Sequence, residues 1–378
     1  MLADKEVAGT LAQYGPRGRG LDAGGGDGAC ESASRELAHP HDRVQTEAIE
    51  LMKSALPRRT LLGLAAAAAA ASRGSAQTII PDEGIDILVG FQSTGGPDVV
   101  ARRISTELER RIGRRIGVEN RPGDAGARPG DTLKRQPPDG TVLALFAFPT
   151  FIAQLAEPEV RFDPVADLAP ISLVGTWPVA LAVSPKIGVS TFEDYRRWLK
   201  SDDPARHRIG STIPDAFTES FNRIFSRELG VAVQGVVSPG PGALVNDLAS
   251  GRVPAGVSGI VSLLEHHRGG RLRLLLTTGP ERLAVARDVS TTRELGMPGL
   301  EMVQWYGFFA RAGTPQPLID EWNHQIVAVL RDPLVAGEFA QMGLTISPST
   351  PQQLAQLLEH DLAAWKARLV SVGITPVR

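Results

Sequence analysis

The chain has 378 residues, of which 40 are Lys or Arg and 42 are Asp or Glu, so its formal net charge is −2. A chain of this length fits one large or two medium α/β domains, and its 22% of charged residues gives no sign of general disorder. The near balance of charge, without a stretch of clustered Lys and Arg, argues against a nucleic-acid surface and against charge-driven attraction to a membrane.

Residues 1–51 differ from the rest of the chain. They include the glycine-rich, charged run GPRGRGLDAGGGDG and lack the apolar periodicity of a helix or strand. We expect this segment to be disordered, or to result from a start codon assigned too far upstream. It contains Cys30, the only cysteine, so a chain without this segment could form no disulfide.

Residues 52–76 have the pattern of an export signal. A short basic region precedes an apolar core, and the small residues Gly74 and Ala76 stand before a plausible cleavage point at Gln77. Arg58 and Arg59 are compatible with twin-arginine export and also with an ordinary secretory signal. A membrane helix is the alternative, but residues 61–71 are fewer than the roughly 20 apolar residues that cross a bilayer. We therefore predict an exported protein.

Strands and helices alternate from residue 85 onward. Apolar residues that recur every four positions from Val100 to Ile112 predict an amphipathic helix, and a second helix should begin with the capping-box pair Ser190 and Glu193. Further elements are expected as a helix at 217–229 and strands at 85–91, 116–120, 141–148, 179–184, 208–212, 231–237 and 271–279. This alternation predicts an α/β fold with parallel-rich sheets and right-handed crossovers.

We expect two domains. The chain should cross between them near residues 176–178 and return near 303–306, so that residues 77–175 and 304–378 form one domain and residues 176–303 the other. Ligands of open α/β sheets bind at the carboxyl ends of the strands, so two such domains would enclose a cleft between them.

A glycine-rich elbow, GFQSTGGPDVVAR, follows the first predicted strand. Gly95 and Gly96 allow a tight turn, and Pro97 suits the first position of a helix. The exposed backbone N–H groups, with the hydroxyls of Ser93 and Thr94, could bind a carboxylate at the positive end of the helix dipole. The alternative is a plain strand-to-helix turn in which Asp98 is a favourable acid of the first helical turn.

Other segments have the same form of strand, bend and helix. VVSPGPGA places Ser238, Pro239, Gly240 and Gly242 at a second elbow, and two elbows could face each other across a cleft. Two further predicted strands also end at candidate site residues. The strand at 141–148 ends at Phe148, Pro149 and Thr150, and the strand at 208–212 ends at Ser211 and Thr212.

Six ordered blocks of sequence carry a resemblance to a known family. They are GFQSTGGPDVVAR, VENRPGDAG, PPDGTVLAL, RFDPVADLAPISLVG, DLASGRV, and WYGFFARAGTP followed by LIDEWNHQIVAVLRDPLV. In order and spacing they resemble the tripartite tricarboxylate transporter substrate-binding proteins, the Bug family, over residues 85–373. The resemblance implies a two-domain periplasmic binding protein of the type II, Venus-flytrap fold, whose cleft holds a small organic acid with its carboxylate near the first elbow.

The same resemblance implies partners and site residues. It implies delivery of the ligand to the membrane permease subunits of a tripartite transporter by a protein that acts as a monomer. The Phe-x-x-Gly-Gly-x-x-Asp pattern of the family falls on Phe91, Thr94, Gly95 and Asp98, so Thr94 stands where a glycine is usual. Ser238, Pro239 and Gly240 replace the family's Tyr-Lys-Gly, which should alter the choice of ligand.

Asp98 would repel an anion unless it accepts backbone N–H groups, binds waters or meets an ammonium group. We favour the first of these roles, although an amino-acid ligand would reverse the preference.

An enzyme is the main rival class. The sequence has no G-x-S-x-G elbow, no phosphate-binding P-loop and no G-x-G-x-x-G after a strand, so we predict neither catalytic residues nor a cofactor. His266 and His267 are adjacent and should lie on different helix faces, so we expect no metal site. A ligand-presenting role toward a sensor protein is a second rival that the sequence leaves open. Trp305 and Tyr306 could line the cleft, but we favour core packing for both.

Overall fold

The computed structural model describes residues 79–158, 160–212 and 215–377. The predicted disordered start, the export signal and Cys30 therefore lie outside the described residues. The described residues belong to one compact unit. None of the helices in this part of the chain combines the length and the apolarity that crossing a bilayer requires.

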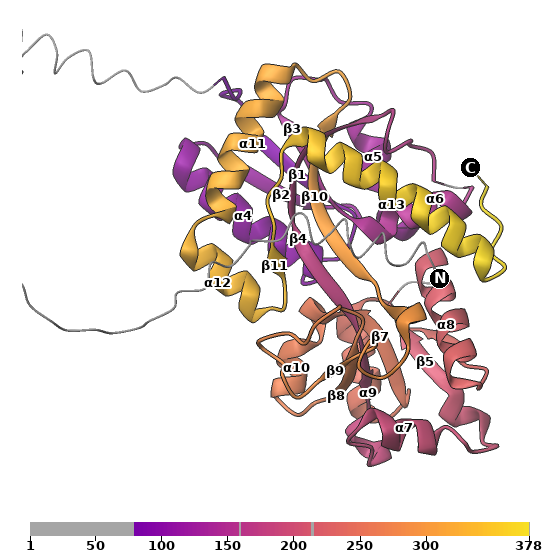
Figure 1. Cartoon of the computed structure of the whole chain (residues 1–378). Coiled ribbons are helices and arrows are strands. Elements are labelled where there is room, and N and C mark those ends of the chain that lie inside the picture. Colours follow the sequence, from indigo (N-terminus) through magenta and orange to yellow (C-terminus); the bar gives the residue numbers. More distant parts are fainter. Residues whose placement is uncertain (1–78, 159, 213–214, 378) are drawn as a thin grey trace, which may run out of the picture. The chain divides into compact units, whose positions relative to one another are not determined.

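The strands of the described residues form one twisted sheet (Figure 1). They are β1 (Ile85–Val89), β2 (Ile116–Asn120), β3 (Val142–Ala147), β4 (Leu168–Val183), β5 (Arg208–Ser211), β6 (Gln234–Val237), β7 (Ala255–Gly259), β8 (Arg273–Thr277), β9 (Ser290–Thr291), β10 (Val303–Arg311) and β11 (Thr345–Ile346). Six of the seven predicted strands are thereby confirmed in place, with ends that agree to within three residues. The segment predicted at 179–184 is only the end of the much longer β4.

The α-helices connect these strands and cover the sheet. They are α4 (Gly96–Ile112), α5 (Arg128–Leu133), α6 (Phe148–Ala156), α7 (Phe192–Trp198), α8 (Ala216–Leu229), α9 (Pro241–Ser250), α10 (Leu264–Arg268), α11 (Gln316–Leu330), α12 (Pro333–Gln341) and α13 (Pro351–Ser371). Short 3-10 turns are η1 (Asp124–Gly126), η2 (Pro185–Ile187), η3 (Pro204–His207), η4 (Ile260–Ser262) and η5 (Pro298–Leu300).

One predicted helix start is wrong by one residue. The capping box of α7 is formed by Thr191 and Asp194, and not by Ser190 and Glu193. The Thr191 hydroxyl accepts the Asp194 N–H at 3.1 Å, and the Asp194 carboxylate accepts the Thr191 N–H at 3.2 Å. Because α7 begins at Phe192, its N-cap is the threonine, although both pairs have the same sequence spacing.

The sheet runs in the order β2-β1-β3-β10-β4-β7-β5-β6. The α/β fold class is confirmed, but the sheet is more mixed than predicted. Strand β1 pairs in parallel with β2 and β3, and β5 pairs in parallel with β6 and β7. The long strands β4 and β10 run antiparallel to each other and to β7 and β3, respectively, in the middle of the sheet.

Strand β4 joins two halves of the sheet, and its partners change at the predicted crossing. Up to Pro178 it pairs with β10, whose first residue is Val303, and from Val179 it pairs with β7. Figure 1 shows β4 passing from the half that contains β1, β2 and β3, the first lobe, into the half that contains β5, β7 and β8, the second lobe. The division into two separate domains stays a prediction, because the sheet is continuous through β4.

Aromatic rings fill the core of the first lobe. Phe146 packs on Phe151 and Phe162 with ring centroids 5.2 and 5.6 Å apart, and Phe148 stacks on Trp305 at 4.9 Å. The Trp305 side chain is fully buried, as predicted, and its Nε1–H donates to the Asp361 carboxylate at 2.8 Å. This cluster fixes α6 against β3 and β10. Each of these three elements also contributes a residue to the cavity described next, namely Pro149, Ala147 and Tyr306.

Candidate ligand-binding site

A cavity of about 430 Å³ opens at the carboxyl ends of β1, β3, β5 and β7. From the first lobe it is lined by Gly90, Phe91, Gln92, Gly95, Gly96, Pro97, Pro122, Gly123, Asp124, Ala125, Gly126, Ala147, Pro149 and Glu157. From the second lobe and from β4 and β10 it is lined by Trp177, Val179, Thr212, Asp215, Phe217, Thr218, Pro239, Gly240, Pro241, Val257, Ser258, Gly259, Ser262 and Tyr306. Both predicted elbows thus reach one cavity.

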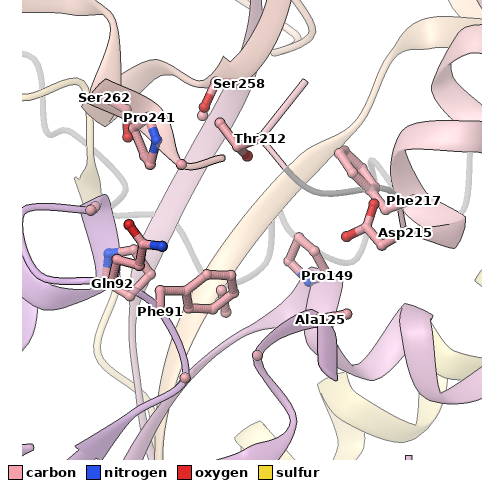
Figure 2. A pocket seen from close by; sticks show the side chains of 18 of the residues that line it. Phe91, Gln92, Ala125, Pro149, Thr212, Asp215, Phe217, Pro241, Ser258 and Ser262 are labelled. Atoms are coloured by element: carbon pink, nitrogen blue, oxygen red, sulfur yellow. The ribbon is translucent and has the colours of Figure 1, made fainter. Parts of the chain in front are cut away.

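The structure divides the predicted site residues into two groups. Those that line the cavity are Phe91, Gly95, Gly96, Pro149, Thr212, Pro239 and Gly240. Those that are not part of its lining are Ser93, Thr94, Asp98, Phe148, Thr150, Ser211, Ser238 and Gly242. Figure 2 shows Phe91 and Gln92 on one side of the cavity and Thr212 and Ser258 on the other. Contact of any of these residues with a ligand stays a prediction.

The first elbow uses two of its backbone N–H groups internally. The Thr94 N–H donates to the Asp98 carboxylate at 2.9 Å, and the Gly95 N–H donates to the Gln92 carbonyl at 3.2 Å. Within the described part of the chain, the N–H of Gly96, the first residue of α4, has no acceptor. The N–H groups of Thr94 and Gly95 are therefore occupied in holding the shape of the turn, whereas the Gly96 N–H, at a residue that lines the cavity, stays available to a ligand.

Asp98 stabilises the elbow by hydrogen bonds and does not itself line the cavity. Besides the Thr94 N–H, its carboxylate accepts hydrogen bonds from Arg102 Nε at 2.9 Å and Asn120 Nδ2 at 2.8 Å. Burial opposes ionisation, but the hydrogen bonds from Arg102, Thr94 and Asn120 outweigh it and hold the pKa of Asp98 below its ordinary value. The predicted backbone-capping role is confirmed, and it explains how Thr94 is held at φ 69°, a region that suits glycine better than threonine.

Two aromatic side chains from the centre of the sheet form the wall beside Gly96. Tyr306 is 3% exposed and belongs to the hydrophobic core, as predicted, but it also lines the cavity. Its Oη lies so close to Gly96 that a Cβ there would be 2.7 Å away. Trp177 packs on Tyr306 with ring centroids 5.3 Å apart. The Trp177 Nε1–H is buried and has no acceptor among the described residues. Burial raises the pKa of Tyr306, so its phenol stays a neutral hydrogen-bond donor.

The second elbow is held by a buried acid. Gly240 adopts φ 92° as the N-cap of α9, and Pro239, Gly240 and Pro241 line the cavity. Ser238 instead points inward, where its hydroxyl donates to Asp247 and its N–H donates to the Ser211 carbonyl at 2.8 Å. The Ser238 hydroxyl is thus occupied in fixing the bend, and is not offered to the cavity.

Ser238→Ala is expected to lower the free energy of unfolding by about 1–3 kcal/mol, because a buried hydrogen bond to a charged group is lost. Ser238 is fully buried and Asp247 is 8% exposed, whereas the second partner of Asp247, Arg252, lies at the surface. Urea denaturation would measure the change, and Ser250→Ala, at an exposed position of the following helix α9, is the control. Equal stability of the two variants would contradict this role.

The remaining predicted residues lie beneath the cavity. Phe148 belongs to the aromatic core, and Thr150 is buried with no partner for its hydroxyl among the described residues. Gly126, at φ 88°, separates Thr150 from the cavity, and a Cβ there would lie 2.6 Å from the Thr150 hydroxyl and 2.7 Å from the Phe91 ring. Glycine is needed at this position because the loop passes directly over both side chains.

The sequence reasoning missed several lining residues. Asp215, the N-cap of α8, accepts the Thr218 N–H at 2.8 Å and lies in the cavity wall with only 5% of its surface exposed. Gln92 reaches across the cavity, since its Oε1 would lie 3.2 Å from a Cβ at Gly240. An Asp directly before a predicted helix is a cap signal that could have located Asp215, but Gln92 had no local signal.

The charged side chains of the cavity lining are all acidic. Asp124, Glu157 and Asp215 line the cavity, and the described lining includes no Lys, Arg or His. Among the described residues, no group of three His, Cys, Asp or Glu side chains is placed to hold a metal ion. The cavity therefore offers neutral donors on one wall and carboxylates on others.

Two lobes joined by central antiparallel strands, with a cavity at the strand ends between them, are the architecture of the periplasmic binding proteins. Two solved structures show this similarity. The chain is 26% identical to a structure described as a periplasmic transporter, with a TM-score of 0.73 over 78% of this chain and 99% of that one. It is 25% identical to MatC from Rhodopseudomonas palustris with bound malate, with a TM-score of 0.70 over 76% of this chain and 99% of that one.

The chain belongs to the family of tripartite tricarboxylate transporter receptors, whose model matches residues 100–374. It is also 27% identical to BugT of Bordetella pertussis over 295 residues, which is 78% of this chain and 90% of that protein. The chain is accordingly a solute-binding receptor. Its family and fold are those of periplasmic binding proteins and not of enzymes. Membership of this family implies a periplasmic location.

Proposed function

We propose that the protein captures a small organic acid in the cavity between the lobes and delivers it to the permease subunits of a tripartite transporter. The observation that carries this proposal is the cavity itself, in which the Gly96 N–H, without an acceptor among the described residues, lies next to the Tyr306 phenol. Two neutral donors from different elements in a largely buried wall suit a carboxylate group. In keeping with this, MatC was solved with malate.

The residues proposed to meet the ligand come from both lobes. Phe91, Gly96 and Pro149 act from the first lobe, and Thr212 and Gly240 from the second. Ser93, Thr94, Asp98, Ser211, Ser238 and Gly242 support the two elbows in this proposal and have no direct contact with the ligand.

Closure of the lobes follows from the architecture. Strand β4 is shared by both lobes and changes its partners at Pro178 and Val179, and we propose the hinge at this point. On the proposed mechanism, a ligand that touches Gly96 in one lobe and Gly240 in the other binds the closed form better than the open form and shifts the population toward it. The closed form then docks on the permease as a monomer.

The proposed export signal at 52–76, on either the twin-arginine or the general secretory route, would release a chain that begins at Gln77. N-terminal sequencing of the protein recovered from the periplasm tests this directly. Retention of residues 1–51 would contradict it.

Ligand binding is tested by thermal unfolding of the chain from Gln77 in the presence of malate, adipate, citrate, benzoate and common amino acids. A ligand that binds only the folded state at a hundred times its Kd stabilises it by about 2.7 kcal/mol, which is a shift of several degrees in Tm. At least one of these organic acids is expected to give such a shift. If no compound of the panel changes Tm, the proposal is contradicted. If a compound raises Tm but cells that contain the protein and its permease do not take that compound up, the transport role is contradicted.

A further inference from the structure

The cavity has an unusual distribution of hydrogen-bonding groups. Two donors that have no partner among the described residues, the Gly96 N–H and the Tyr306 hydroxyl, lie together on one wall, next to the Trp177 ring. Asp215 and the Thr212 and Thr218 hydroxyls belong to the second lobe, whose wall lies across the cavity from Phe91 in Figure 2. A ligand that fits both walls must present acceptors to the first and donors to the second.

Asp215 is the carboxylate that most needs such a donor. It is 5% exposed, and it forms no ion pair with any described residue, whereas Asp124 pairs with Arg128 at 3.2 Å. Among the described residues, its hydrogen bonds come from the N–H and hydroxyl of Thr218 and from its own backbone N–H. A buried carboxylate without a cation carries a desolvation cost that a positive partner would offset.

The position of Asp215 is fixed by packing around it. It caps α8, and the next residue but one, Phe217, lines the cavity and packs on Trp365 of α13 with ring centroids 5.6 Å apart. Figure 2 shows the Asp215 carboxylate beside Phe217 at the edge of the open space. Burial raises the pKa of Asp215 to about 6, and hydrogen bonds from Thr218 oppose the rise, as expected for an acid that lacks a cation.

A metal ion does not account for the acids. Among the residues that the structure describes, no group of three carboxylate, thiol or imidazole side chains is placed to bind one. The Asp215 carboxylate and the neighbouring Thr218 hydroxyl offer acceptors that match instead the N–H donors of a primary ammonium group.

We propose that the ligand is a zwitterion, with an ammonium group that pairs with Asp215 and a carboxylate that meets the wall of Gly96, Tyr306 and Trp177. This inference rests on the proposed function and narrows it from organic acids to amino acids. It makes Asp215 the residue that selects amines over plain acids.

The test compares matched ligands that differ by one amino group. Isothermal titration calorimetry would be run with the pairs aspartate and succinate, glutamate and glutarate, and 4-aminobutyrate and butyrate. In the best-binding pair, the amino compound is expected to bind at least tenfold more tightly than its partner. Asp215→Asn should abolish that preference by weakening the amino compound about tenfold or more, while it leaves the plain acid unchanged or tighter.

The asparagine variant is chosen because Asn caps helices as well as Asp does, so α8 should keep its start. Glu219→Gln is the matched control, since Glu219 lies one turn along the same helix and pairs at the surface with Arg223 at 2.7 Å. This control should bind both members of each pair like the unmodified chain.

The outcomes separate the two proposals. If succinate, glutarate or butyrate binds as tightly as its amino counterpart, or if Asp215→Asn leaves the preference intact, the zwitterion inference is overturned and the receptor function stands. If none of the six compounds binds and the wider acid panel also gives no thermal shift, both proposals are contradicted.

Discussion

Phe151→Ala is expected to lower the free energy of unfolding by about 3–5 kcal/mol, the usual cost of removing a large ring from a closed core. Phe151 is fully buried in the first turn of α6, two residues after the cavity residue Pro149. Its ring contacts five others, with centroid distances of 5.2 Å to Phe146, 6.3 Å to Phe148, 6.2 Å to Phe162, 5.9 Å to Trp305 and 5.6 Å to Phe309. The surrounding rings are rigid and mutually packed, so they cannot collapse into the space without losing other contacts.

Urea denaturation followed by tryptophan fluorescence would measure this loss. Leu334→Ala is the control, because Leu334 is 75% exposed on α12 and should change the stability by less than about 0.5 kcal/mol. A loss below about 1.5 kcal/mol for Phe151→Ala would show that this cluster is loosely packed.

The second large effect is a dependence of stability on pH that comes from Asp361. Its carboxylate accepts Trp305 Nε1–H inside the core and is 4% exposed. Burial raises its pKa from the ordinary value of 3.8 to about 6, although the bond from Trp305 and the charge of His360 oppose the rise. Below pH 3.8 both the folded and the unfolded chain hold this proton, so Asp361 then has no effect on stability.

Between pH 3.8 and about 6 the unfolded chain releases the proton while the folded chain retains it. Stability must therefore fall as the pH rises through this window, and the full cost, on the order of 3 kcal/mol, is present above it. Asp361→Asn removes this titration and keeps an oxygen acceptor for Trp305. Relative to the unmodified chain, the variant should thus gain about 2 kcal/mol of unfolding free energy between pH 4 and pH 7, since a small part of the cost is already present at pH 4.

This comparison does not depend on how well asparagine fits the core, because any fixed packing cost cancels between the two pH values. The control is Asp320→Asn on the surface of α11, whose difference in unfolding free energy from the unmodified chain should be the same at both pH values. If the Asp361→Asn difference also stayed constant within about 0.5 kcal/mol, the carboxyl would have to titrate normally in the folded chain.

Local pattern was enough to place most of the elements. The four-residue repeat from Val100 to Ile112 is α4, and IGVEN is β2 without a shift of either end. Such patterns are readable because a helix or strand buries one face at a fixed period, whatever lies opposite. The predicted crossing near residues 176–178 also matches the change of partners along β4, although β4 was predicted as its last few residues only.

The candidate site was predicted only in part, because local sequence does not say which polar groups are already occupied. Thr94 and Gly95 lie in a convincing anion-binding elbow, yet their N–H groups donate to Asp98 and to the Gln92 carbonyl. Ser238 was predicted as a ligand contact, but it faces inward to Asp247, a partner nine residues further along the chain.

The sequence by itself determined the α/β class, the order of most elements, the family resemblance and the two glycine elbows, since these depend on short-range pattern and on backbone conformations open to glycine. Only the tertiary structure decided which groups reach the cavity. Trp177, Asp215 and Tyr306 come from distant segments, and a side chain's burial and free hydrogen-bonding capacity are set by neighbours that the folded sheet brings to it.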